Sequence, residues 1–167
     1  GLHATTQLCL ELLERNLSNQ TRALTVIDVG TGSGILSIAA ALLGASQVRA
    51  YDIDCESIEI AKANARLNCV SDLLAYETFD FSKKLSKDFF NTSNQADLIV
   101  ANISHTALVS MMHNFSSSIK LGGQLIISGF GPVAVDELVA VGAEVGFELY
   151  ANVSRDQWCA LMMTRKF

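Results

Sequence analysis

Basic side chains are scarce in this sequence. Its 167 residues contain 12 Lys and Arg against 17 Asp and Glu, which gives a formal net charge of -5. Proteins that bind nucleic acid neutralise phosphates with clustered Lys and Arg, and the sequence shows no such clustering. The charge therefore argues against direct nucleic-acid binding and favours a protein or a small molecule as the partner.

Signs of metal sites, disulfide frameworks and membrane segments are also lacking. The cysteines lie far apart, with no C-x-x-C pair and no histidine at zinc-ligand spacing, so we expect reduced, mostly buried thiols and no metal. The hydrophobic runs 35–43 and 121–127 are too short to span a bilayer, and no signal-peptide pattern opens the chain. We therefore expect a cytoplasmic protein with no membrane partner. The four cysteines are Cys9, Cys55, Cys69 and Cys159.

What is present is a regular alternation of strand-like and helix-like segments. Five β/α repeats followed by a hairpin predict a single domain over residues 1–167, with an α/β Rossmann-like fold. Its sheet should be mostly parallel, with helices on both faces and one antiparallel strand near an edge. We expect strands at 24–29, 47–53, 73–77, 97–103, 123–128, 146–153 and 158–164, and helices at 8–17 (capped by Thr5–Thr6), 35–43, 56–68, 106–119 and 133–145. The polar stretch 82–95 should be a loop with a short helix around Phe89 and Phe90.

A glycine-rich loop follows the first expected strand. Gly30, Gly32 and Gly34 alternate, which lets the backbone turn sharply and bring its N–H groups against a ligand. A nicotinamide-binding loop would have glycine where Ile35 stands, whereas G-x-G-x-G is typical of enzymes that use the sulfonium donor S-adenosylmethionine. Asp28 can accept hydrogen bonds from the loop or, directly or through water, from the amino-acid end of the donor. Its alternative role is a turn or helix-dipole cap.

Two aspartates stand at the end of the second expected strand. Asp52 is the first residue after the apolar run, where a carboxylate can accept hydrogen bonds from both ribose hydroxyls of an adenosine. Asp54 could do the same but is better placed as the N-cap of the next helix. We therefore expect Asp52 to bind the ribose and Ile53 to pack on the adenine face.

Asn102 is the candidate catalytic residue. It follows the apolar run 98–101, and its amide oxygen can accept a hydrogen bond from the amine of the donor or from an incoming amine nucleophile. The alternative is a helix cap or turn asparagine. Methyl transfer is an in-line displacement driven by the sulfonium, so the protein needs to supply only alignment and desolvation.

Four aromatic side chains have weaker claims to a role. No carboxylate partner can be identified in sequence for any histidine, so we expect surface or core positions for them. Trp158 should lie in the core of the last strand, although it could line a substrate channel. The histidines are His3, His105 and His113.

Taken together, these segments resemble one family over the whole chain, the PrmA-type protein-lysine methyltransferases, which methylate the eleventh protein of the large ribosomal subunit. The resemblance implies a class I S-adenosylmethionine-dependent methyltransferase fold, S-adenosylmethionine as cofactor, and transfer to a lysine or N-terminal α-amine of that ribosomal protein. It also implies donor contacts from Thr6, Gly30, Asp52 and Asn102, of which Thr6 is added by the resemblance alone. The segments that carry it are 3–10, 26–37, 52–54, 64–68, 100–103, Ser128-Gly129 and Trp158.

The sequence departs from the family pattern at three positions. Ala4 replaces a usual proline, Thr31 a usual cysteine and Phe130 a common isoleucine, and none of these removes a proposed donor contact. Family members also carry an upstream domain that holds the ribosomal protein, and nothing here corresponds to it, so we expect a piece of a longer protein. The alternatives are a methyltransferase with another protein or small-molecule substrate, and a donor-binding module without catalysis. A nicotinamide-dependent oxidoreductase is disfavoured by Ile35.

Overall fold

The structure is a computed structural model that describes residues 3–18, 22–83 and 95–167. The short helix expected around Phe89 and Phe90 lies outside these residues. Throughout the described ranges, no helix is long and apolar enough to cross a membrane.

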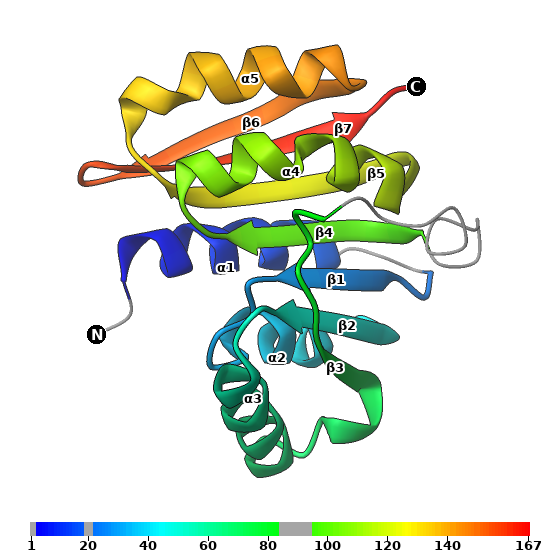
Figure 1. Ribbon diagram of the computed structural model, residues 1–167. Coiled ribbons are helices and arrows are strands. Elements are labelled where there is room, and N and C mark those ends of the chain that lie inside the picture. Colours follow the sequence, from blue (N-terminus) through cyan, green and yellow to red (C-terminus); the bar gives the residue numbers. More distant parts are fainter. Residues whose placement is uncertain (1–2, 19–21, 84–94) are drawn as a thin grey trace.

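A seven-stranded sheet in the order β3-β2-β1-β4-β5-β7-β6 forms the centre of the molecule (Figure 1). The first five strands in that order pair in parallel, and β7 pairs antiparallel with both of its neighbours. The predicted mostly parallel sheet with one antiparallel strand near its edge is therefore confirmed. The strands are β1 (Thr25–Val29), β2 (Gln47–Asp52), β3 (Leu74–Thr78), β4 (Ala96–Asn102), β5 (Ile119–Phe130), β6 (Phe147–Arg155) and β7 (Trp158–Arg165).

Helices cover both faces of the sheet because its central strands are apolar on both sides (Figure 1). In β1, Val26 belongs to a buried cluster that also contains Leu8 and Leu36 from the helices of one face. Ile27, the next residue, belongs to the cluster on the other face with Leu108. The helices are α1 (Ala4–Leu17), α2 (Ile35–Leu42) and α3 (Cys55–Leu67) on the first face, and α4 (His105–Ser118) and α5 (Val135–Glu144) on the second.

Two expectations about local structure were wrong. The cap of α1 is His3 rather than Thr5–Thr6, because the His3 ring accepts the Thr5 N–H and the helix already begins at Ala4. Strand β5 begins at Ile119 rather than at residue 123, because Ile119 already pairs with Ala96 of β4. The register then shifts before Gln124 pairs with Leu98, across a segment in which Gly122 has a φ of +76°.

The expectation of mostly buried cysteines holds for only two of the four. Cys9 and Cys159 are buried, and burial raises the pKa of the Cys9 thiol to about 12, so it stays neutral. Cys55 and Cys69 are exposed because one begins α3 and the other follows its end on the solvent side. All four are free thiols, as expected.

The order of the strands determines where a ligand can bind. The chain runs from β1 outward to β2 and β3, and then returns to place β4 on the other side of β1. The connections after β1 and β4 therefore leave in opposite directions, and in such sheets ligands bind at the carboxyl ends of the strands at this point. Helix α1 begins on the side to which the arrowheads of β1 and β4 point (Figure 1).

Candidate functional site

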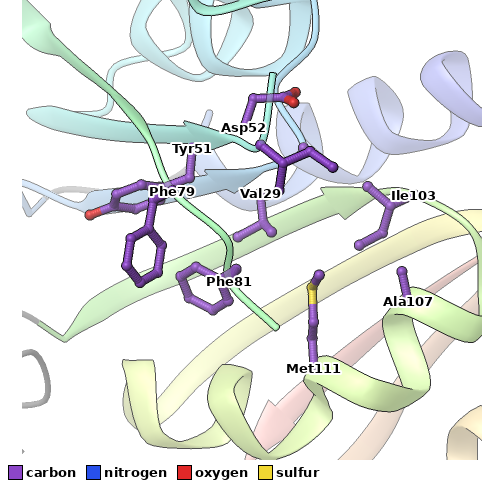
Figure 2. A pocket seen from close by; sticks show the side chains of 10 residues that line it. Val29, Tyr51, Asp52, Phe79, Phe81, Ile103, Ala107 and Met111 are labelled. Atoms are coloured by element: carbon purple, nitrogen blue, oxygen red, sulfur yellow. The ribbon is translucent and has the colours of Figure 1, made fainter. Parts of the chain in front are cut away.

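An apolar pocket of about 290 Å³ lies at the point where the strand order reverses. Figure 2 shows Phe79 and Phe81 on one side of it and Ile103 and Ala107 on the other. Among the described residues that line it, Asp52 is the one with a charged side chain. A largely apolar cavity with one carboxylate suits a flat heteroaromatic ring joined to a hydroxylated group. The lining residues are Val29, Gly30, Tyr51, Asp52, Ile53, Phe79, Phe81, Ile103, Ala107 and Met111.

The glycine loop crosses the ends of β2 and β4. The N–H groups of Gly30 and Thr31 donate to the Tyr51 carbonyl at 2.8 and 3.0 Å. Gly30 has a φ of +74°, and a Cβ there would lie 2.4 Å from Cγ2 of Ile103, so a side chain would be both strained and obstructed. At Gly32, by contrast, a Cβ would meet no atom within 4 Å. The loop is thus packed at its first glycine and open at its second.

Asp28 is fully buried beneath this loop. Its Oδ2 accepts hydrogen bonds from the Thr31 hydroxyl at 2.7 Å and the Ser37 N–H at 3.0 Å. Its Oδ1 is buried and has no hydrogen-bond partner in the described part of the chain. Burial raises the pKa of the carboxyl to about 6, although both hydrogen bonds oppose the shift. Asp28 therefore holds the loop through one oxygen and leaves the other unsatisfied.

The two aspartates after β2 have different surroundings. Asp52 lines the pocket, and its oxygens accept the N–H groups of Gly32 at 2.9 Å and Asp54 at 3.0 Å. Asp54 caps α3, as expected, by accepting the N–H groups of Glu56 and Ser57. Ile53 lies in the pocket wall and is 72% exposed, so an apolar surface is available there to a ligand.

Asn102 lies at the end of β4 beneath the start of α1. Its side-chain N–H donates to the Thr6 hydroxyl at 3.3 Å, a contact between residues 96 positions apart. The β6–β7 hairpin fixes the same end of α1. The His3 ring meets the Trp158 ring edge-on at 5.0 Å between centroids, and Arg155 contacts Gln7 and Glu11. The end of β4 and the β6–β7 hairpin therefore hold Thr6 over the carboxyl ends of the parallel strands.

The structure places all the predicted site residues at one edge of the sheet but also adds some. Sequence reasoning assigned no individual ligand role to the aromatic pair after β3, Phe79 and Phe81. It also assigned none to Ala107 and Met111, the apolar pair of α4 that lines the pocket. The second pair has helical i, i+4 spacing, which is a signal that the sequence does contain. The lining residues without a predicted individual role are Tyr51, Phe79, Phe81, Ile103, Ala107 and Met111. Three of them lie in 77–81 and 102–104, the segments after the third and fourth expected strands, where the sheet topology predicts a ligand site.

One histidine has a carboxylate neighbour that the sequence did not reveal. His105 Nε2 lies 2.8 Å from Oε2 of Glu137, which belongs to α5 and comes 32 positions later. His3 caps α1 and packs on Trp158. The described residues hold no group of three or more His, Cys, Asp or Glu that could bind a metal ion.

Comparison with known proteins gives consistent matches along the chain. The family model described as "Ribosomal protein L11 methyltransferase (PrmA)" matches residues 1–166. The ribosomal protein L11 methyltransferase of Dechloromonas aromatica (strain RCB) is 39% identical over 161 residues, which cover 96% of this chain and 49% of that protein. That of Streptococcus equi subsp. zooepidemicus (strain MGCS10565) is 39% identical over 165 residues, again covering 49% of it. The chain thus spans about half the length of these curated relatives.

A solved structure supports the same relationship. The ribosomal protein L11 methylase of Lactobacillus delbrueckii subsp. bulgaricus superposes with a TM-score of 0.86 at 35% identity, covering 100% of this chain and 81% of that one. The fold is that of the class I S-adenosylmethionine-dependent methyltransferases. On the combined evidence of sequence and fold, the chain belongs to the ribosomal protein L11 methyltransferase (PrmA) family.

Proposed function

We propose that this chain is the catalytic domain of an enzyme that transfers methyl groups from S-adenosylmethionine to amino groups of a ribosomal protein. The family supports the eleventh protein of the large subunit as that substrate, with a lysine or the N-terminal α-amine as the acceptor. Such a substrate would place the reaction in the cytoplasm. The observation that carries the proposal is the meeting of the open glycine loop, Asp52 and Asn102 at one edge of the sheet, beside an apolar pocket.

The residues at this edge fit the donor. The pocket accommodates an adenosine, with Asp52 accepting hydrogen bonds from the ribose and Ile53 covering the adenine. The space around Gly32 admits a ligand to the loop backbone. The unpartnered Oδ1 of Asp28 is an acceptor for a donor-bound water or amine, which would relieve the cost of leaving that atom unsatisfied. Thr6, in the first turn of α1, adds a hydroxyl beside Asn102 to these donor contacts.

The roles of the residues follow from the chemistry. S-adenosylmethionine supplies a methyl group that is activated by its sulfonium, so the chain needs no nucleophile or metal of its own. Asn102 orients the incoming amine through its amide oxygen. Its side-chain N–H is meanwhile held by the Thr6 hydroxyl, which accepts it. A lysine must lose its proton before it attacks, and an apolar surrounding favours the neutral amine.

The decisive experiment combines binding with turnover. Titration calorimetry with S-adenosylmethionine should give one site per chain, and incubation with methyl-labelled donor and the purified ribosomal protein should label that protein. Since the chain spans about half of its relatives' length, the assay should also use the longest product of the gene that contains it. Donor binding without labelling in either form would favour a donor-binding module, and labelling of a different protein would favour another substrate. Absence of donor binding would overturn the proposal.

A further inference from the structure

A second groove, of about 360 Å³, lies at the carboxyl ends of β4 and β5. Its walls come from the start of α4, the end of β5, the short 3-10 helix Pro132–Ala134 with α5, and the start of β7. None of the residues predicted to bind the donor lines it. Its lining includes the side chains of His105, Val133, Glu137 and Trp158 and the backbone of Gly129.

This groove adjoins the donor site at Ile103. Ile103 lines the donor pocket with its side chain, and its N–H donates to the Ser128 carbonyl at 3.2 Å. Gly129 has a φ of +102°, and a Cβ there would lie 2.1 Å from the Ile103 carbonyl oxygen, so the groove wall is pressed against the Ile103 backbone. The start of α1 contacts residues on both sides of this boundary, because Thr6 contacts Asn102 while His3 contacts Trp158 of the groove.

The described lining of the groove contains one carboxylate and one imidazole. Glu137 is its single carboxylate, and no lysine or arginine is among the described residues that form it. The Glu137 side chain is 56% exposed, and its Oε2 lies 2.8 Å from His105 Nε2. Beside it are the fully exposed Val133 and the partly exposed ring of Trp158. An apolar and aromatic wall next to one carboxylate suits an aliphatic chain that ends in an ammonium group.

We propose that this groove receives the amine-bearing side chain of the acceptor and that Glu137 determines its specificity for cations. The inference rests on the proposed function and adds the route by which the acceptor reaches Asn102. A primary amine on an aliphatic chain is protonated in neutral water, so it approaches as a cation. A carboxylate at the rim of the groove attracts that form and mainly raises its rate of capture. The amine then releases its proton to solvent before it attacks the methyl group.

The test exchanges charge at two neighbouring positions of α5. Asp136 is exposed, adjoins Glu137 in sequence and does not line the groove, so Asp136→Lys is the matched control for Glu137→Lys. Steady-state kinetics of the full-length protein with the ribosomal protein should show KM for the acceptor raised roughly tenfold in Glu137→Lys and less than twofold in Asp136→Lys. The donor Kd should be the same in both variants. Glu137→Gln keeps the shape of the side chain and removes its charge, and it should raise the acceptor KM about threefold. Added salt should reduce the difference in acceptor KM between Glu137→Gln and the wild type, because salt screens the charge of Glu137.

The outcomes separate the two proposals. An active wild type whose acceptor KM responds equally to the two lysine substitutions, or to neither, would overturn the groove assignment and leave the proposed function intact. The same holds if Glu137→Lys weakens donor binding instead. A wild type that binds the donor but methylates nothing would overturn both. If Glu137→Lys does not fold, the acceptor KM of Glu137→Gln is compared with that of Asp136→Asn. A larger KM in Glu137→Gln supports the groove assignment, and equal values overturn it.

Discussion

Asp97 and Asp28 are buried carboxylates on the neighbouring strands β4 and β1, and their surroundings differ. Asp97 lies where the parallel strands begin, here called the amino edge, and Asp28 lies where they end, the carboxyl edge. Asp97, at the start of β4, accepts hydrogen bonds from the Thr25 N–H and hydroxyl at 2.9 and 3.0 Å and from Lys120 at 3.0 Å, with Arg22 3.3 Å away. Burial acts to raise its pKa, but these partners outweigh burial and the pKa lies below its usual value. Asp28, at the end of β1, has donors on one oxygen only.

The difference separates stability from function in this fold. The amino edge of the sheet satisfies its buried charge completely, as a structural ion network should. The carboxyl ends of the strands carry the Asp28 oxygen without a partner among the described residues, the raised pKa of that carboxyl, the apolar pocket and the groove beside Glu137, which are features that cluster where ligands bind. Changes at the first edge should therefore affect folding alone, and changes at the second should affect binding.

The largest effect is expected at the amino edge. Asp97→Ala removes the acceptor of two Thr25 donors and the partner of Lys120. The loss should lower the free energy of unfolding by about 4 kcal/mol, because a buried N–H and a charge lose their partner. For a chain of this size the midpoint of thermal unfolding should fall by roughly 10 °C, as measured by circular dichroism. The affinity for S-adenosylmethionine at low temperature should be unchanged. A large loss of that affinity would contradict the claim that the amino edge affects folding alone.

The next effect concerns pH at the carboxyl edge. Since the folded-state pKa of Asp28 is raised from 3.8 to about 6, the folded protein holds this proton more tightly, and stability falls as pH rises through that range. Asp28→Asn keeps an acceptor oxygen for Thr31 and Ser37 but cannot ionise. Its stability relative to the wild type should increase by about 3 kcal/mol from pH 3 to pH 8, as measured by urea unfolding. A difference that is constant with pH would show that Asp28 does not titrate there.

A smaller effect distinguishes the two aspartates after β2. Asp52→Ala should weaken S-adenosylmethionine binding by about 2 kcal/mol, or roughly 30-fold, through the loss of charged hydrogen bonds to the ribose. Asp54→Ala should leave donor affinity unchanged and cost about 1 kcal/mol of stability, because only the cap of α3 is lost. Calorimetric titration and thermal unfolding of both variants measure the contrast. If Asp54→Ala weakens binding more than Asp52→Ala does, the ribose assignment is wrong.

The smallest effect tests how α1 is held over the site. Arg155 joins the β6–β7 hairpin to Gln7 and Glu11, so Arg155→Ala should loosen the helix that carries Thr6. An exposed pair of this kind contributes up to about 1 kcal/mol, which predicts a donor Kd raised roughly threefold. Lys166→Ala, which removes a 3.1 Å ion pair with Glu148 away from α1, is the control and should leave Kd unchanged. Equal donor affinity in the two variants would contradict a positioning role for Arg155.

The sequence predicted the alternation of elements because period and turn residues are local signals. It also separated Asp52 from Asp54, since a strand tip and a helix cap differ in the residues beside them. It could not reveal contacts made by the packing of distant elements, such as those of Asn102 with Thr6 and of His105 with Glu137. The apolar side chains that line the pocket beside Asp52 received no individual role for another reason. Their hydrophobicity and spacing, including the i, i+4 spacing of Ala107 and Met111, are equally those of core residues.

The contrast between the two edges can be measured in one titration. Amide chemical shifts of the isotope-labelled chain should be followed by NMR as S-adenosylmethionine is added. We predict large shifts for Gly30, Gly32, Asp52 and Asn102 and negligible shifts for Thr25, Asp97 and Lys120. Shifts centred on the second group, or no shifts at saturating donor, would contradict the assignment of the donor site to the carboxyl edge.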